Sequence, residues 1–362
     1  MSKDGQITIQ FNWIFLLIVG GIILFFFIGL VSVQKKSSEG SVSAELLSQL
    51  STYFTGAGVS IGTVTVYDVP RMHLEFTCDK FYVNEVADRD FRNKVLFTPH
   101  EIHGNKLITW TLDWSVPFRV MNLIYISSPQ IRYVVFYGTS GNSLDLFKDF
   151  NKSFPPELNY HAYPVISSDN INDYAKILDY NNEKIHFVDL NSPINQDLVF
   201  QIAKEKFNMA EEDIVFTKVV PSNPGNPPQS MQATAKVEFY DMNKTGWSKQ
   251  TFVNSSGTLF EDADAFDSVS LYGAVVSGDL EKYSCVLSKM FANLNRASKI
   301  LKMRSQNISN GYLDQCRGVH FGAAELLSML SNADIGTSLN GPIGELDELN
   351  RQARRYSCAP IY

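Results

Sequence analysis

An uninterrupted apolar run from Trp13 to Val33 constrains this chain more than any other feature of its sequence. The run contains 21 residues without a charge and begins close to the first residue. A helix rises about 1.5 Å per residue, so about 20 apolar residues cross a hydrocarbon core of about 30 Å. The sequence therefore predicts one membrane-spanning helix near the N-terminus, with a globular chain after it.

The residues after this run indicate a retained anchor rather than a cleaved signal peptide. A secretory signal has a shorter apolar core of about 7–15 residues, followed by small residues at the cleavage site. Here Lys35 and Lys36 come almost directly after the run, and the nearest small-residue site begins only at Val42. Trp13 and the lysine pair are suitable interfacial anchors. We expect 1–36 to form an N-terminal segment and a transmembrane helix.

The charges that flank the apolar run and the length of the globular part lead to different predictions of the membrane orientation. Positively charged flanks favour the cytoplasmic side, and Lys35 and Lys36 outnumber Lys3, which has Asp4 beside it. This pattern alone would place the globular part in the cytoplasm. Long domains, however, translocate largely regardless of flanking charge. With the cysteines and the resemblance described next, we expect the globular part to be extracytoplasmic.

The cysteines form an even set, as expected of an exported domain with disulfides: Cys78, Cys285, Cys316 and Cys358. None of them forms a C-x-x-C pair, which argues against a zinc ribbon or a thioredoxin-like site. Four cysteines allow three pairings. We favour a bridge among the last three, because they lie in one helical region.

The first residues resemble a known type of N-terminal segment. The stretch from Lys3 to Phe11 reads Lys-Asp-Gly-Gln-Ile-Thr-Ile-Gln-Phe and leads directly into the apolar run. It resembles the class III signal segments of archaeal type IV pilin-like proteins, in which a basic residue and a glycine precede Gln-x-Ser-x-Glu-Phe. Gln6, Thr8 and Phe11 fit this pattern, whereas Gln10 stands where that family has glutamate. The resemblance implies cleavage between Gly5 and Gln6.

The layout of the whole chain also resembles that of uncharacterised archaeal single-pass membrane proteins. This second resemblance includes the C-terminal residues Tyr356 to Tyr362, and it implies no activity.

The composition of the chain argues against one class of partner. The formal net charge is -7, and no basic patch with interleaved aromatics occurs, so we expect no nucleic-acid partner. A hydrophobic fraction of 44% is enough for folded cores.

The order of strand and helix patterns predicts a mixed α/β fold, α+β overall. Residues 37–56 read as an amphipathic juxtamembrane helix, which either continues the membrane helix as a stalk or packs against the domain, with Gly40 as a potential break. Residues 57–130 are rich in strand patterns. Residues 131–228 alternate strands with helices, including a helix at Ile171–Leu178 and a strand at Lys184–Leu190, and so predict βαβ units and a mostly parallel sheet. Residues 229–362 begin with a β-hairpin and continue as helices.

The helical region begins with one long apolar periodicity from Ser268 to Met303. Glycines inside this stretch are candidate helix breaks, at Gly273 and at Gly278. We expect two further helices, Val319–Leu330 and Ile343–Arg354.

A loop between the first strand and the first helix of the 131–228 region is the sharpest local pattern. Gly138 to Ser143 reads Gly-Thr-Ser-Gly-Asn-Ser. Such a loop at a helix N-terminus can hold a phosphate through backbone N–H groups and the helix dipole. It resembles the flavodoxin phosphate loop at Ser140, Gly141, Asn142 and Ser143, which implies a phosphate-bearing ligand. The alternative is a plain turn and N-cap, for which the same residue types are favoured.

Two weaker groups of residues are considered as metal ligands. His100 and His103 could both serve one metal on a turn, but the sequence identifies no third ligand. Acidic residues precede the long helix without the spacing of an EF-hand: Glu261, Asp262, Asp264 and Asp267. A solvated hairpin tip and charges that favour the helix dipole explain these groups more simply, so we expect no metal.

These patterns together predict a single-pass membrane protein with a large extracytoplasmic domain. We expect a structural or interaction role at the cell surface, in adhesion, in the envelope or in a pilus-like system. Its expected partners are the lipid bilayer and surface or pilus-like proteins. The alternative is a ligand-binding or enzymatic α/β domain that uses the Gly138–Ser143 loop. No catalytic motif is recognisable, so we assign no catalytic residue and no cofactor.

Overall fold

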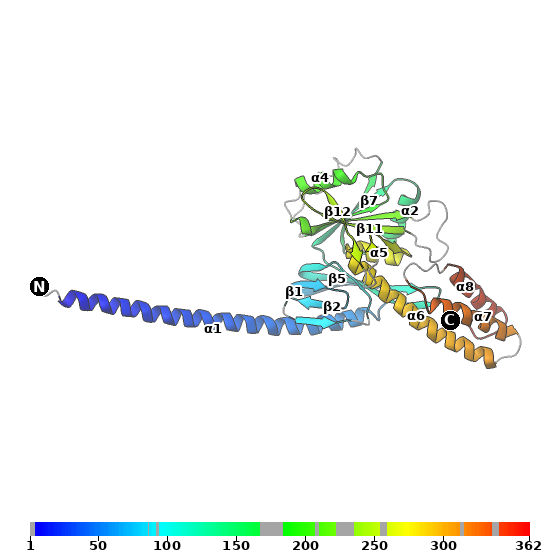
Figure 1. The fold of residues 1–362 in the computed structure, drawn as a ribbon, viewed down its shortest axis with the longest axis horizontal. Helices are drawn as coiled ribbons and strands as arrows, with labels where there is room; N and C mark the ends of the chain where they lie inside the picture. The colour runs from blue at the N-terminus through cyan, green and yellow to red at the C-terminus, as the bar shows by residue number, and fades with distance from the viewer. Residues whose placement is uncertain are drawn as a thin grey trace.

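The chain forms one long helix that leads into a head at its far end (Figure 1). The computed structural model describes residues 4–85, 87–91, 94–166, 184–206, 210–221, 235–253, 259–311, 315–334 and 340–362. Helix α1 (Asp4–Ala57) is continuous over 54 residues and passes through Gly40 without a break. The predicted helix at 37–56 is therefore the second half of α1 rather than a separate element.

The first sheet of the head lies against the end of α1. Its strand order is β3-β2-β1-β5-β6-β4, with all neighbours antiparallel except β4 and β6. The strands are β1 (Val64–Phe76), β2 (Lys80–Val83), β3 (Ala87–Asp90), β4 (Leu96–Phe97), β5 (Glu101–Ser115) and β6 (Arg119–Ser127).

The last turns of α1 pack on this sheet through a narrow apolar stripe. Leu46, Leu47, Leu50 and Phe54 are all buried, and Phe54 is only 1% exposed. The Phe54 ring lies 5.3 Å from the ring of Phe81, edge to face. The spacing of these four residues places them on one side of a helix with 3.6 residues per turn. The sequence left two alternatives for residues 37–56, a continuation of the first helix or packing against the domain. The structure shows both, because this half continues the long helix and also packs on the head.

The second sheet of the head has the order β12-β11-β10-β9-β7-β8, with β15 beside β11. Strands β8, β7, β9 and β10 are parallel neighbours, while β11 pairs antiparallel with β10, β12 and β15, so the sheet is of mixed orientation. Its strands are β7 (Ile131–Gly138), β8 (Asn159–Val165), β9 (Lys184–Leu190), β10 (Ile214–Pro221), β11 (Ala235–Met242), β12 (Trp247–Lys249) and β15 (Ala263–Ala265). The helix predicted at Ile171–Leu178 lies outside the described residues.

Helices cover both faces of the second sheet. Along β7, Tyr133 and Val135 face a core shared with α2 (Gly141–Ser153) and α5 (Ser268–Ser277), while Val134 and Phe136 face a core shared with α4 (Gln196–Lys206). This alternation is the period of two expected along a strand. Helix α5 contacts strands of both sheets and so lies between them (Figure 1). A short 3-10 turn, η2 (Glu211–Asp213), and a small hairpin, β13 (Phe252–Val253) with β14 (Leu259–Phe260), complete this part.

The chain ends in three packed helices, α6 (Leu280–Gly311), α7 (Gln315–Leu330) and α8 (Asn340–Arg355). The break between α5 and α6 lies at Gly278, which has a left-handed φ of 60°. Gly273 does not break α5; a Cβ there would lie 2.5 Å from the Phe97 ring, so this glycine allows close packing instead. The prediction of a mixed α+β fold with an N-terminal apolar helix and C-terminal helices is confirmed.

Candidate functional site

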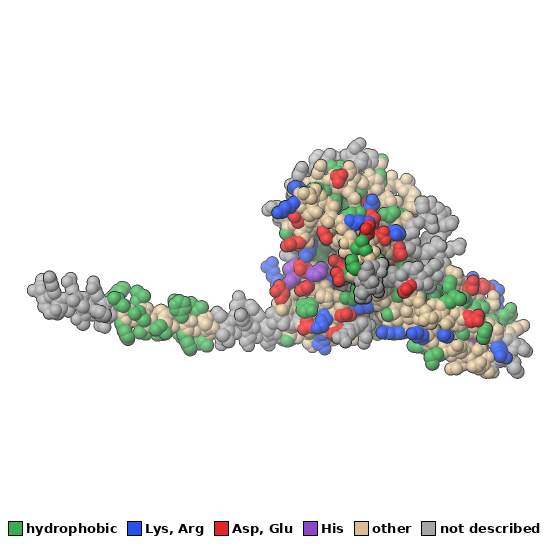
Figure 2. All heavy atoms as spheres, viewed as in Figure 1, with side chains coloured by type: hydrophobic (Ala, Val, Ile, Leu, Met, Phe, Trp, Pro, Cys, Tyr) green, Lys and Arg blue, Asp and Glu red, His purple; other side chains and the backbone are tan. Residues whose placement is uncertain are grey.

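The first half of α1 is the most unusual surface of the molecule. Trp13–Val31 has a mean hydropathy of 3.1, and none of it is buried. Figure 2 shows this half as a rod of hydrophobic side chains that projects away from the head. Among the described residues it is the one helix that is long and apolar enough to cross a membrane. A helix that is apolar on all sides needs an apolar surrounding. Gly5 and Gln6, the predicted processing site, lie in the first turn of α1.

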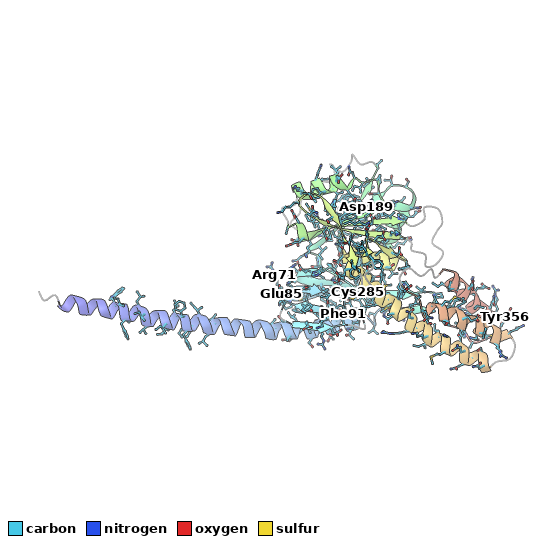
Figure 3. The ribbon with its side chains drawn as sticks, in the orientation of Figure 1. Arg71, Glu85, Phe91, Asp189, Cys285 and Tyr356 are labelled. Carbon is cyan, nitrogen blue, oxygen red and sulfur yellow. A yellow bond between two sulfur atoms is a disulfide. The ribbon has the colours of Figure 1, made fainter. Side chains whose placement is uncertain are left out.

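The four cysteines lie in two disulfide pairs that tie distant segments of the head together. Cys78, at the turn between β1 and β2, pairs with Cys285 of α6, with Cα atoms 6.1 Å apart. Cys316 of α7 pairs with Cys358 after α8, with Cα atoms 5.6 Å apart. Figure 3 labels Cys285 beside the first sheet. The second pair lies within the helical region that the sequence favoured, whereas the first joins that region to the first sheet. Disulfides of this kind persist in oxidising compartments.

The Gly138–Ser143 loop follows β7 and starts α2, as the sequence predicts. Its last hydroxyl is used inside the protein: Ser143 Oγ accepts from the Gly138 N–H at 2.6 Å and donates to the carbonyl of Leu190. Ser143 is buried, so the residue that completes the flavodoxin-like pattern joins the ends of β7 and β9. Ser140 and Gly141 are exposed at the start of α2, and Asn142 is half-buried. Phosphate binding by this loop stays a prediction.

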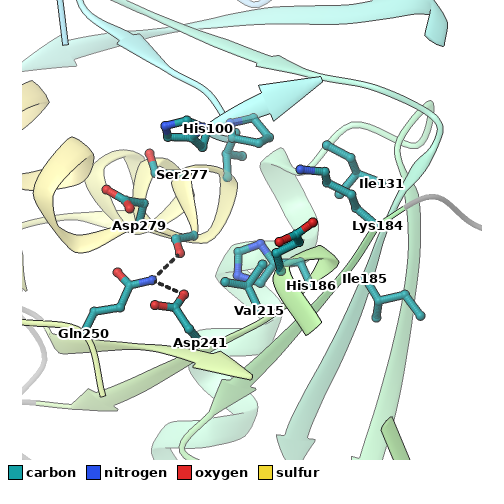
Figure 4. A pocket seen from close by; sticks show the side chains of 14 residues that line it. His100, Ile131, Lys184, Ile185, His186, Val215, Asp241, Gln250, Ser277 and Asp279 are labelled. Atoms are coloured by element: carbon teal, nitrogen blue, oxygen red, sulfur yellow. Dashed lines mark hydrogen bonds between the residues drawn. The ribbon is translucent and has the colours of Figure 1, made fainter. Parts of the chain in front are cut away.

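A cavity of about 120 Å³ lies between the two sheets, at the opposite end of the parallel strands from this loop. Figure 4 shows its polar walls: His100 from the first sheet, Lys184 and His186 from β9, and Asp241 and Asp279 from β11 and the α5–α6 corner. We call it the junction cavity. Ligands of α/β folds bind at the carboxyl ends of parallel strands, and this cavity lies at their amino ends.

Hydrogen bonds occupy much of the junction cavity's polar wall. Gln250 donates to Asp241 at 2.6 Å and accepts from the Leu280 N–H at 2.7 Å, which caps the start of α6. Burial, together with the nearby Asp279 carboxylate, raises the pKa of Asp241 although Gln250 donates to it. Ser277 Oγ is buried here, and among the described residues it has no hydrogen-bond partner that could act as a base.

Two buried basic groups adjoin the junction cavity and are also structural. Burial lowers the pKa of His186 to about 3, and its imidazole lies 2.7 Å from the Thr217 hydroxyl. Burial lowers the pKa of Lys282 to about 7, and its ammonium donates to the Pro99 carbonyl at 2.7 Å. The His186 contact joins two strands of the second sheet, and the Lys282 contact joins α6 to the segment between β4 and β5. The cavity can hold water, but its lining residues do not form a nucleophile with an adjacent base.

The two histidines considered in the sequence line different cavities but share a neighbour. His100 lines the junction cavity, while His103 lines an open hollow of about 440 Å³ together with His73. The Glu101 carboxylate lies 3.7 Å from His100 Nδ1 and 3.5 Å from His103 Nε2.

The prediction of a hairpin tip is wrong, because Glu101 and His103 lie in strand β5. His73 of β1 is directly opposite His103 in the sheet register, and Glu101 lies two residues from His103 on the same side of the strand. The sequence analysis missed His73. A spacing of two along a strand could have placed Glu101 beside His103.

Two of the four acidic residues before α5 have side-chain partners in the structure. Asp267 caps α5: its side chain accepts from the Ser270 N–H at 2.7 Å. Asp262 pairs with Lys236 of β11 at 3.2 Å. Asp267 thus lies at a helix N-terminus, as the simpler explanation predicts, whereas Asp262 forms an ion pair with a strand of the second sheet.

Comparison with known protein families, with curated proteins and with solved structures found no match to this chain.

Proposed function

We propose that this chain is a single-pass, membrane-anchored protein of the cell surface, with its head outside the cytoplasm and a structural, pilus-like role. The observation that carries the proposal is the continuity of α1 from an unburied apolar half into a half that packs on the head. The helix thus serves as membrane anchor and as a rigid connection to the head. Its partners are the lipid bilayer and other surface or pilus-like proteins.

The continuous helix sets the distance between membrane and head. Residues 34–45 separate the apolar run from the buried apolar stripe that begins at Leu46. At 1.5 Å per residue this segment is about 20 Å long. Because it is helical throughout, it holds the head at a fixed distance from the bilayer, unlike a flexible linker.

The disulfides support the external placement of the head. All four cysteines are paired, and the Cys78–Cys285 pair closes a sequence separation of 207 residues. Cytosolic thiols are kept reduced, so two structural disulfides favour an oxidising exterior. The resemblance of residues 3–11 to pilin-like segments adds the pilus-like part of the proposal.

N-terminal mass spectrometry of the protein purified from its native membrane tests the pilus-like part. Processing after Gly5 gives a mature chain that begins at Gln6, and the protein then appears in the fraction sheared from the cell surface. A Gly5→Val variant serves as the matched control and keeps the uncut N-terminus. An intact N-terminus at Met1 or Ser2 in the native protein would contradict pilin-like processing and leave the membrane anchor in place.

A further inference from the structure

Three side chains on neighbouring strands of the first sheet converge on one point. The imidazoles of His73 and His103 stack with centroids 4.3 Å apart and an angle of 6° between their planes. Glu101 Oε2 lies 3.8 Å from His73 Nε2 and 3.5 Å from His103 Nε2. One donor atom from each residue lies within 4.8 Å of the others. Strand pairing explains the convergence, because His73 is opposite His103 and Glu101 shares the face of His103.

These distances are close to those of a tetrahedral metal site. Ligand atoms about 2.0–2.1 Å from a zinc ion are about 3.3 Å apart, so small side-chain rotations would bring the three donors to one ion. His73 Nε2 is buried and has no hydrogen-bond partner within the described parts of the chain. A buried polar atom left in this state is destabilising, and a bound metal would satisfy it.

The surroundings fix His73 in place. Its backbone N–H donates to the Asn84 side chain at 2.9 Å, and its carbonyl accepts from the Asn84 N–H at 2.8 Å. Glu85 lies with a carboxylate oxygen 3.7 Å from His73 Nδ1, the ring nitrogen on the other side from the cluster. A carboxylate in this position is the usual outer partner of a metal-binding histidine. Asn84 and Glu85 both have left-handed φ values, 52° and 59°, in the turn that brings them there.

Lys184 is the group that competes with a metal for the carboxylate. Its ammonium lies 3.4 Å from Glu101 Oε2 and also 3.7 Å from Asp213. Burial opposes ionisation of Glu101, but Lys184 and the nearby histidines outweigh it and lower the pKa of the carboxyl. Asp213 offers Lys184 an alternative carboxylate partner when a cation binds Glu101.

We propose that His73, Glu101 and His103 bind a divalent transition metal, with Zn²⁺ as the ion best matched to two imidazoles and one carboxylate. The hollow beside the histidines, which Arg71 and Gly104 also line, leaves room for a fourth ligand from solvent or from a partner. Figure 3 labels Arg71 and Glu85 on this side of the head. In Figure 2, histidine side chains lie among charged groups on the head. The site would stand apart from the anchor and goes beyond the proposed surface role.

Titration of the full chain in detergent with Co²⁺ tests the proposal, because tetrahedral Co²⁺ has visible absorption bands that the free ion lacks. We expect one equivalent to bind with such bands, and Zn²⁺ to displace it. His103→Ala and His73→Ala should each weaken binding at least about tenfold. His161→Ala is the matched control, since this histidine of β8 lies beside Arg132 in the second sheet, and it should leave the bands and the affinity unchanged.

A second readout separates a lost site from a misfolded variant. Zn²⁺ should raise the Tm of the native chain and of His161→Ala, and should leave the Tm of His103→Ala unchanged, while the three metal-free proteins unfold at similar temperatures. His103 is 42% exposed, so its truncation leaves the fold intact. Absence of Co²⁺ bands at saturating metal, or equal binding by the native chain and His103→Ala, would overturn the proposal.

Discussion

The two halves of α1 share one helical backbone but have opposite surroundings. The first half is apolar on all sides and exposes every large side chain from Trp13 to Ile18 by more than half. The second half is apolar on one stripe only, and that stripe is buried against the first sheet. An all-round apolar surface requires an apolar surrounding, whereas a stripe requires only one packed face. In the proposed function, the first half therefore provides attachment and the second half contributes to the stability of the head.

This division makes membrane attachment and stability of the head separable. No buried core residue of the head comes from Trp13–Val31, the part of the first half whose side chains the structure describes. Changes in the first half should then alter insertion and leave unfolding of the head unchanged. Changes in the second half and in the head should do the opposite.

The largest expected effect is on insertion. Replacing Ile22 and Phe26 by aspartate places two charges near the middle of the apolar run, at about 3 kcal/mol each on the insertion scale, or about 6 kcal/mol together. We expect most of the protein to become extractable by alkaline carbonate. The double alanine variant at these positions should stay in the membrane fraction. An aspartate variant that remains fully resistant to extraction would break the assignment of this half to lipid.

Loss of the longer disulfide should be the largest effect on the head. A Cys78→Ser/Cys285→Ser variant removes a link across 207 residues, and loop-closure entropy gives an upper value of about 5 kcal/mol for this link. The Cys316→Ser/Cys358→Ser variant, across 42 residues, should lose about 1 kcal/mol less. Urea unfolding followed by tryptophan fluorescence measures both. Equal unfolding midpoints for the native chain and the first variant would show that this link does not stabilise the head.

Truncation of Phe54 tests the packed half of α1 directly. Phe54→Ala removes a ring that is 1% exposed and contacts Phe76 and Phe81, so the free energy of unfolding should fall by about 3–5 kcal/mol. Phe25→Ala, on the exposed half, is the matched control and should not change it. If both variants unfolded at the same urea concentration, the two halves would not differ as the comparison requires.

The smallest expected effect concerns pH and is confined to the head. The pKa of His186 in the folded chain is about 3, below its ordinary value of 6.5, so only the unfolded chain binds the proton between these values. Stability should therefore fall as pH drops below 6.5, by up to about 1.4 kcal/mol per pH unit. His186→Gln should reduce this slope, measured by urea unfolding at pH 7 and pH 5. Thr217→Val keeps the imidazole and should keep the slope; parallel profiles for the native chain and His186→Gln would contradict the prediction.

Local patterns in the sequence were enough to find many elements of the head. The strand predicted at Lys184–Leu190 has the same bounds in the structure, because a short apolar run between polar turns leaves little choice. Gly278 was a candidate break and is one, since glycine adopts the left-handed conformation at low cost. Gly273 had the same local signal but no effect on the helix, because its role is to admit the Phe97 ring.

Features that depend on pairing between distant segments could not be predicted. The register that places His73 opposite His103 joins residues 30 positions apart, and no local pattern specifies it. The Cys78–Cys285 link depends on how α6 crosses the first sheet. The inward position of Ser143 depends on the end of β9, which the loop pattern does not contain. The candidate metal site thus arises from sheet topology rather than from a motif.

Labelling of cysteines in intact cells with a large, membrane-impermeant maleimide is the most direct test that the head lies outside the cytoplasm. We predict labelling only after treatment with an impermeant reductant. The four cysteines form two disulfides, and in the proposed orientation these lie on the outer side of the membrane. The two double-serine variants identify which pair reacts. Labelling that needs cell lysis but no reductant would place the head in the cytoplasm and contradict the proposed surface role.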